Sequence, residues 1–204
     1  MEAMGVPTTI QAAKAALRKD MKAILKSLSP ESKAEQSKIV TQRVLNHAHY
    51  VNARNLAIYL SMNDEINTQS LLKDALSSGK KCFVPRYFAD GRAMDMVELM
   101  DLDDYDRLPL TRWNIKQPHE QDTHRPDALK SGLDLILVPG LAFTASGQRL
   151  GRGKGYYDTY LQKCKSILSP GPQTLALAFQ EQIVDHIPTH DHDQSLDAVI
   201  APNL

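Results

Sequence analysis

The sequence predicts an α/β fold: a single domain in which a mostly parallel sheet is flanked by helices on both faces. Short apolar runs alternate with longer segments in which apolar residues recur every three or four positions. One run, Leu133 to Val138 (LDLILV), is nearly continuously apolar, as expected of a strand buried on both faces. Strands that alternate with helices in this way form parallel sheets covered by helices.

The first half of the chain predicts three helices and three strands. Apolar residues with helical spacing place the first helix at about 10–28. Ser29-Pro30-Glu31 has the N-cap, first-turn proline and first-turn acid of a second helix, which extends to about His47. The remaining elements of this half are a strand at 55–62 (NLAIYLSM), a helix at 68–78 that Gly79 would end, and strands at 81–86 and 93–99.

The second half predicts the part of the sheet that carries the site. Residues 101–131 are polar and contain prolines, so we expect irregular structure with one short helix. After the strand 133–138 we expect a helix at 155–165 and strands at 174–179 and 197–201. In sheets of this kind ligands bind at the carboxyl ends of the strands, and a glycine-rich segment follows the strand 133–138.

Composition limits the classes of function. The chain has 204 residues, which suits one domain over 1–204, and we expect residues 1–9 to be disordered. Lys plus Arg and Asp plus Glu are both 24, so the balanced charge favours neither nucleic acid nor a membrane surface as a partner. Two cysteines, Cys82 and Cys164, indicate buried reduced thiols. The N-terminus lacks the pattern of a secretion or transit signal, and we expect a cytoplasmic monomer.

Residues 147–158 (GQRLGRGKGYYD) predict a phosphate-binding loop at 149–157. Four of the chain's ten glycines lie between 147 and 155, interleaved with Arg149, Arg152 and Lys154. Glycines let successive backbone N–H groups point at one anion, and the following helix adds partial positive charge at its N-terminus. Arginine offers a planar fork to phosphate oxygens, and lysine a compact charge.

The loop is neither of the two commonest phosphate motifs. A Walker A loop would need a glycine at Gln148 and a serine or threonine at Gly155, and the dinucleotide fingerprint would need a glycine at Tyr156. The alternative to a phosphate site is a glycine-rich surface hairpin with scattered charges.

Two segments, Pro139 to Phe143 and Arg149 to Asp158, resemble the signature of the 5-formyltetrahydrofolate cyclo-ligase family. The resemblance covers nearly the whole chain. It extends through Lys14 to Arg18, Leu60 to Glu65, Trp113 to Ile115 and His192 to Asp197.

The resemblance implies an enzyme that converts 5-formyltetrahydrofolate and ATP, with Mg²⁺, to 5,10-methenyltetrahydrofolate, ADP and phosphate. It also implies a fold similar to the sugar-phosphate isomerase and CoA-transferase-like group. The implied catalytic residues are Arg149, Arg152 and Lys154, and the implied metal ligands are Asp158 and Asp193. The implied ATP contacts are Lys14, Arg18, Arg149, Leu150, Gly151, Arg152, Gly153, Lys154, Gly155, Tyr156 and Tyr157. The implied folate contacts are Leu60, Glu65, Arg152, Gly153, Lys154, Gly155 and Tyr156.

Several of these residues have a simpler interpretation from local sequence alone. Lys14 and Arg18 could belong to a solvated helix face, Glu65 to an exposed turn, and Asp158 to the first turn of a helix. The aromatic side chains Tyr156, Tyr157 and Trp113 could pack on the folate or in the core. Three histidines, His186, His190 and His192, could suggest zinc, although a solvated polar loop is the commoner explanation.

Two competing functions remain open from the sequence. An isomerase or CoA-transferase-like enzyme on the same fold would not hydrolyse ATP or need paired aspartates. A folate- or nucleotide-binding protein without activity could lose Lys154 or Asp193, but both are present. The expected partners are small molecules.

Overall fold

Six strands form one sheet in the order β3-β2-β1-β4-β7-β8, and β5 and β6 form a separate pair. These elements come from a computed structural model, which describes residues 9–88, 93–111, 115–190 and 193–204. In the described residues the helices are α1 (Ile10–Ser27), α2 (Pro30–Leu45), α3 (Ala48–Asn52), α4 (Gln69–Ser77), α5 (Leu102–Arg107), α6 (Ala128–Ser131), α7 (Tyr156–Ile167) and the 3-10 turn η1 (Gln180–Gln182). The strands are β1 (Asn55–Ala57), β2 (Lys81–Tyr87), β3 (Met94–Leu99), β4 (Leu135–Val138), β5 (Ala142–Phe143), β6 (Arg149–Leu150), β7 (Gln173–Leu177) and β8 (Ala198–Ile200).

The order of the strands creates a switch point between β1 and β4. All neighbours in the large sheet are parallel except β2 and β3, which confirms the mostly parallel α/β fold. From β1 the chain crosses through α4 to β2, and from β4 it crosses through α7 to β7 on the other side. Because such crossovers are right-handed, opposite directions place α4 and α7 on opposite faces. A crevice therefore opens beyond the carboxyl ends of β1 and β4.

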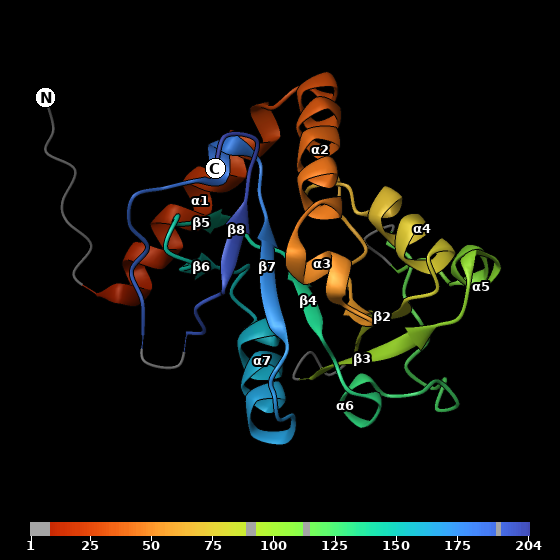
Figure 1. Cartoon of the computed structure of the whole chain (residues 1–204). Helices are drawn as coiled ribbons and strands as arrows, with labels where there is room; N and C mark the ends of the chain where they lie inside the picture. The colour runs from red at the N-terminus through yellow and green to blue at the C-terminus, as the bar shows by residue number, and fades with distance from the viewer. Residues whose placement is uncertain (1–8, 89–92, 112–114, 191–192) are drawn as a thin grey trace, which may run out of the picture.

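Local signals start the first two helices where the sequence predicts them. The side chain of Thr9 accepts a hydrogen bond from the backbone N–H of Ala12 at the start of α1, and Ser29 caps α2 in the same way. Pro30 occupies the first turn of α2, where its missing N–H costs nothing. Figure 1 shows α2 and α4 on the same side of the sheet, where they contact each other.

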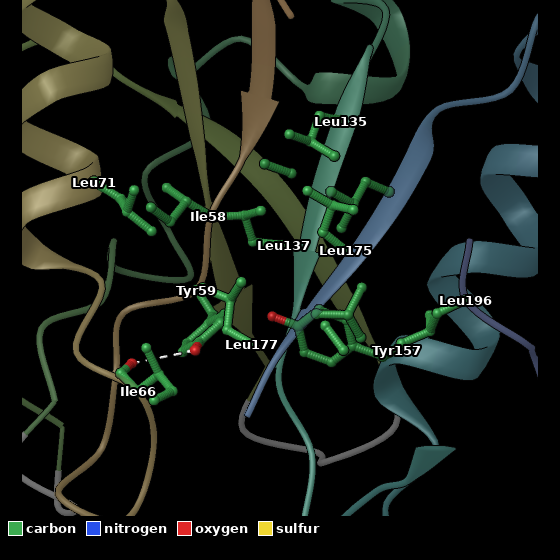
Figure 2. Close-up of a cluster of buried hydrophobic side chains, with 14 of the residues drawn as sticks. Ile58, Tyr59, Ile66, Leu71, Leu135, Leu137, Tyr157, Leu175, Leu177 and Leu196 are labelled. Carbon is green, nitrogen blue, oxygen red and sulfur yellow. Dashed lines mark hydrogen bonds between the residues drawn. The ribbon is translucent and has the colours of Figure 1, made fainter. Parts of the chain in front are cut away.

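The core fills the space between the sheet and its helices. All four side chains of β4 are buried, as the apolar run 133–138 predicts. Figure 2 shows the strand residues Leu135, Leu137 and Leu175 and Tyr157 of α7 in one cluster of buried side chains, with the Tyr59 hydroxyl donating to the carbonyl of Ile66. Burial extends beyond β1, because Tyr59 is buried although it lies outside the strand.

Both cysteines are buried and form no disulfide. Burial raises the pKa of Cys82 to about 12 and that of Cys164 to about 11, so both thiols stay protonated at neutral pH. None of the helices among the described residues combines the length and apolar character that crossing a membrane requires.

Some boundaries differ from the sequence prediction. The strand expected at 55–62 ends at Ala57, because the ladder with β4 joins only two residue pairs before the chain turns into the crevice. The second helix ends at Leu45 and is followed by α3, and the segment 101–131 contains two short helices rather than one. The segment expected to be disordered, 1–9, lies outside the described residues except for Thr9.

Candidate active site

A cleft of about 1400 Å³ lies at the switch point, where the segments after β1 and β4 meet the glycine-rich loop. It brings together every site residue that the sequence predicts. These residues are Lys14, Arg18, Leu60, Glu65, Arg149, Leu150, Gly151, Arg152, Gly153, Lys154, Gly155, Tyr156, Tyr157, Asp158 and Asp193. Of the three histidines considered for zinc, His190 lines the cleft and His186 does not, while His192, like Trp113, lies outside the described residues.

The segment predicted as a phosphate loop contains three kinds of structure. Its first two residues, Arg149 and Leu150, form β6 and pair with β5. Residues 151–155 are the loop itself, and Tyr156 and Tyr157 begin α7. Gly155 is the N-cap of this helix, with a φ of 73° that glycine adopts without strain. No side chain among the described residues caps α7, so its first N–H groups remain available to an anion. The N-terminal helix holds the loop, because the Arg18 Nε donates to the Gly151 carbonyl at 2.9 Å.

Lys14 and Asp193 form a buried ion pair. The side chains are 9% and 16% exposed, and the Asp193 carboxylate also accepts a hydrogen bond of 2.6 Å from the backbone N–H of His190. The structure therefore excludes the simpler interpretation of Lys14 as a solvated helix residue. Each charge offsets the cost of burying the other.

Arg149 and Asp158 form a second ion pair. The Arg149 Nη2 donates to the Asp158 Oδ1 at 2.9 Å, and the Arg149 side chain is only 4% exposed. Its Nη1 donates to the carbonyl of Pro139 at 3.3 Å, so the guanidinium joins the start of α7 to the segment after β4. The backbone N–H of Gln194 donates to the same Asp158 oxygen at 3.4 Å, which brings the neighbour of Asp193 to this carboxylate.

Arg152 joins the loop to the segment after β1. Its Nη2 donates to the Asp64 Oδ1 at 2.7 Å and to the Glu65 Oε1 at 3.1 Å. The other Glu65 oxygen accepts from the backbone N–H of Met62 at 2.9 Å. Burial raises the pKa of Glu65, and the positive charge of Arg152 opposes this rise. Glu65 is thus a buried acid within the cleft rather than an exposed turn residue.

Lys154 differs from the other cations of the loop. Its side chain is exposed, and within the part of the chain that the structure describes it makes no hydrogen bond or ion pair. It lines the cleft next to the N-terminus of α7. An anion in the cleft could therefore be met by this ammonium group without first breaking an ion pair.

Asp158 and Asp193 fit a hard cation. Both line the cleft, and their side chains are 22% and 16% exposed. Carboxylate oxygens are the donors that Mg²⁺ prefers, with the remaining positions filled by substrate phosphates and water. Among the described residues no three His, Cys, Asp or Glu side chains gather into a metal-binding group, so a ligand would have to complete the coordination.

Comparisons with known proteins show the family of the chain. The model of the 5-formyltetrahydrofolate cyclo-ligase family matches residues 10–202. The chain belongs to this family. It is therefore an enzyme of the cyclo-ligase type, as expected from the segments 139–143 and 149–158.

Relatives share nearly the whole length of the chain. The 5-formyltetrahydrofolate cyclo-ligase of Mus musculus is 46% identical over 192 residues, 94% of this chain and 95% of its own length. A probable 5-formyltetrahydrofolate cyclo-ligase of Caenorhabditis elegans is 36% identical and covers 95% of this chain and 94% of its own length.

Solved structures show the same fold. A 5,10-methenyltetrahydrofolate synthetase of Mycoplasma pneumoniae superposes with a TM-score of 0.70 over 93% of this chain and 98% of its own, at 19% identity. The enzyme of the same name from Aquifex aeolicus gives a TM-score of 0.73 over 92% of this chain and 88% of its own, at 24% identity.

This cyclo-ligase family member has cleft residues that sequence reasoning missed. Tyr87 lines the cleft, and its ring lies 5.0 Å from that of Tyr156, tilted by 55°. Burial raises the pKa of Tyr87 and of Tyr157, so both stay neutral phenols. Gln182 does not line the cleft itself, but it is buried behind it, and its amide donates to the carbonyl of the lining residue Gly140 at 2.8 Å. Tyr87 carries no signal in the sequence because it ends an ordinary apolar strand, and Gln182 follows a strand without any motif.

Proposed function

We propose that this enzyme catalyses the ATP- and Mg²⁺-dependent conversion of 5-formyltetrahydrofolate to 5,10-methenyltetrahydrofolate, ADP and phosphate. One observation carries the proposal beyond family membership. A single cleft holds both the cations expected at ATP and the residues expected at the folate, Leu60 and Glu65. Its volume of about 1400 Å³ exceeds the ~300–1,000 Å³ usual for one small ligand, which leaves room for two.

The chemistry needs positioning and charge stabilisation more than a nucleophilic side chain. The formyl oxygen attacks the terminal phosphorus of ATP, forming a P–O bond as the bond to ADP breaks. N10 then attacks the formyl carbon, which its phosphorylated oxygen activates; N10 loses its proton, and phosphate leaves with the former formyl oxygen. The ring closed in this way is the methenyl cation.

The loop 151–155 is suited to the phosphate side of the reaction. Lys154, Arg18 and the first N–H groups of α7 would neutralise the charge on the transferring group. Arg152 would lie between the two substrates, because it connects the loop to Glu65. Glu65 itself would accept hydrogen bonds from the N–H groups of the reduced pterin, and Tyr156 would pack on its flat face.

Asp158 and Asp193 would hold Mg²⁺, which would supply positive charge to neutralise the phosphates. Each aspartate is paired with a cation in the structure, Asp158 with Arg149 and Asp193 with Lys14. Lys14 is one of the residues expected to contact ATP. Lys14 could therefore turn from its carboxylate partner to a phosphate of ATP, with little change in the number of buried charges.

The test is the ultraviolet absorbance of the methenyl product after mixing the protein, Mg·ATP and 5-formyltetrahydrofolate. We expect an increase that requires both ATP and Mg²⁺, with one ADP formed for each product molecule. An absorbance that does not depend on ATP would contradict the proposal. ADP formed without product would contradict it as well.

The cytoplasmic compartment and the monomeric state expected from the sequence remain predictions. A relative from Arabidopsis thaliana, 29% identical, is named a mitochondrial 5-formyltetrahydrofolate cyclo-ligase. Cell fractionation and analytical ultracentrifugation would measure the two properties directly.

A further inference from the structure

Arg149 has a different environment from the other loop cations. Its side chain is 4% exposed, whereas that of Arg152 is 32% exposed. The two terminal nitrogens of Arg149 are already bonded, one to Asp158 and the other to the carbonyl of Pro139. Its Nε is buried and has no partner among the described residues, and the guanidinium carbon lies 5.8 Å from the centre of the Tyr157 ring. This is the environment of an inward-facing arginine.

Two motif glycines make room for this side chain. A Cβ built on Gly151 would lie 2.8 Å from the Arg149 Nη1. A Cβ on Gly140 would lie 2.7 Å from the Phe143 ring and 3.1 Å from the Arg149 Cγ, so Gly140 makes room for both side chains. The φ angle of Gly151 is not in the left-handed region, so an alanine there would fit the backbone and would collide only with the guanidinium. Part of the glycine content that suggests a phosphate cradle therefore accommodates Arg149.

We infer that Arg149 is a positioning residue that fixes Asp158 for the divalent cation, and that it does not itself contact the phosphates of ATP. The inference rests on the proposed function. An arginine held between a carboxylate and a carbonyl sets the rotamer of that carboxylate and keeps one oxygen engaged. Such partners of metal ligands contribute to metal affinity without contacting the metal.

If the inference is right, Arg149 and Lys154 affect two different measured quantities. The first is the dissociation constant of ATP in EDTA, which reports phosphate contacts. The second is the factor by which saturating Mg²⁺ tightens ATP binding, which reports the aspartates. Both are measured by isothermal titration calorimetry on the full chain.

For Arg149→Lys we expect ATP affinity in EDTA within about twofold of wild type, and at least a ~10-fold loss of the Mg²⁺ enhancement. Lysine cannot reach both partners with one planar group. For Lys154→Ala we expect the reverse: weaker ATP binding in EDTA and an unchanged enhancement. If R149K weakens metal-free ATP as much as K154A does, Arg149 contacts phosphate and the inference is overturned. It is also overturned if R149K changes neither constant.

Two further variants keep the inference testable if R149K does not fold. Gly151→Ala should displace the guanidinium and reduce the Mg²⁺ enhancement, with thermal unfolding as the check on folding. Asp158→Asn should lower the Mg²⁺ enhancement without changing ATP affinity in EDTA. The double variant with R149K should show no further loss of the enhancement. Additive losses in that double variant would overturn the link between the two residues. A wild type without ATP-dependent turnover would instead defeat the proposed function. If Mg²⁺ does not tighten ATP binding to the wild type, the inference about Arg149 and Asp158 is overturned.

Discussion

Arg152 and Glu65 lie 87 positions apart in the sequence and form an ion pair of 3.1 Å inside the cleft. The pair joins the glycine-rich loop to the segment after β1, across the switch point of the sheet. Its acid is nearly buried, with a side chain 6% exposed, while its arginine is 32% exposed. This asymmetry makes Glu65 the partner whose ionisation costs more, and it leads to the first prediction.

The stability of the protein should depend on pH through Glu65. Its pKa is raised above the ordinary value of 4.5, chiefly by burial, so the folded protein binds this proton more tightly than the unfolded chain does. The contribution of Glu65 to the free energy of unfolding is therefore fully present below pH 4.5, and it is lost as the pH rises through the raised pKa. We expect Glu65→Gln to become progressively more stable relative to wild type across that interval and to level off above it. Thermal unfolding of both proteins across pH measures the difference.

The variant Arg152→Ala provides a control for this pH effect. The guanidinium lowers the pKa of Glu65, so its removal should extend the loss of stability to higher pH. A difference between E65Q and wild type that stays constant with pH would contradict the assignment.

Lys154 and Arg152 should differ in how their removal affects folding. Lys154→Ala should reduce kcat by about a hundredfold or more and change the free energy of unfolding by less than about 0.5 kcal/mol, because its side chain is exposed and unpaired among the described residues. Arg152→Ala should reduce kcat similarly and also destabilise the fold by about 1–3 kcal/mol, because it leaves Glu65 buried without this partner. Urea unfolding with steady-state kinetics measures both. Near-normal turnover in both variants would show that the loop does not serve phosphoryl transfer.

Removing one partner of the pair Lys14–Asp193 should be costly. Asp193→Asn should lower the free energy of unfolding by about 3 kcal/mol, because it leaves the Lys14 ammonium, 9% exposed, without a charged partner. The double variant Lys14→Met with Asp193→Asn should be more stable than the sum of the single losses predicts. A matched control is Asp106→Asn, which breaks a pair whose acid is 77% exposed and should cost less than about 1 kcal/mol. Strict additivity in the double-mutant cycle would show that the pair has no coupling energy.

Gly147 should tolerate alanine poorly, and Gly79 provides the comparison. Both have positive φ angles, 90° and 78°, so alanine is strained at each by about 1–2 kcal/mol. A Cβ at Gly147 would also lie 2.2 Å from the carbonyl oxygen of Leu196, whereas nothing lies within 4 Å at Gly79. We expect Gly147→Ala to cost about 1–3 kcal/mol more than Gly79→Ala in urea unfolding. It should also raise KM for Mg·ATP, because Leu196 follows Asp193. Equal losses of stability would contradict the close approach.

The sequence predicts the fold well because its signals are local. The periodic spacing that starts α1 at Ile10 and the apolar run in β4 depend on a few neighbouring residues, and the structure contains both. The pair β5 and β6 escapes prediction because two-residue strands have no periodicity. The early end of β1 escapes it for another reason: Tyr59 stays buried after the ladder ends, so the apolar pattern continues.

The sequence predicts which residues line the cleft, but it does not predict which of them form ion pairs with one another. The resemblance lists Arg149, Arg152 and Lys154 together, and nothing in a run of glycines and cations distinguishes a buried side chain from an exposed one. The structure distinguishes them through long-range partners, Asp158 for Arg149 and Glu65 for Arg152. Such partners depend on tertiary packing, which one sequence does not reveal.

The cleft takes residues from both ends of the chain. Lys14 comes from α1, and Asp193 from the segment just before β8. During synthesis on the ribosome, strands β1 and β2 can pair long before Asp193 has emerged. The candidate active site is therefore completed only when the segment that carries Asp193 docks on α1. Enzymatic activity should thus appear after secondary structure in a refolding experiment, and it would report completion of the native state more faithfully than circular dichroism does.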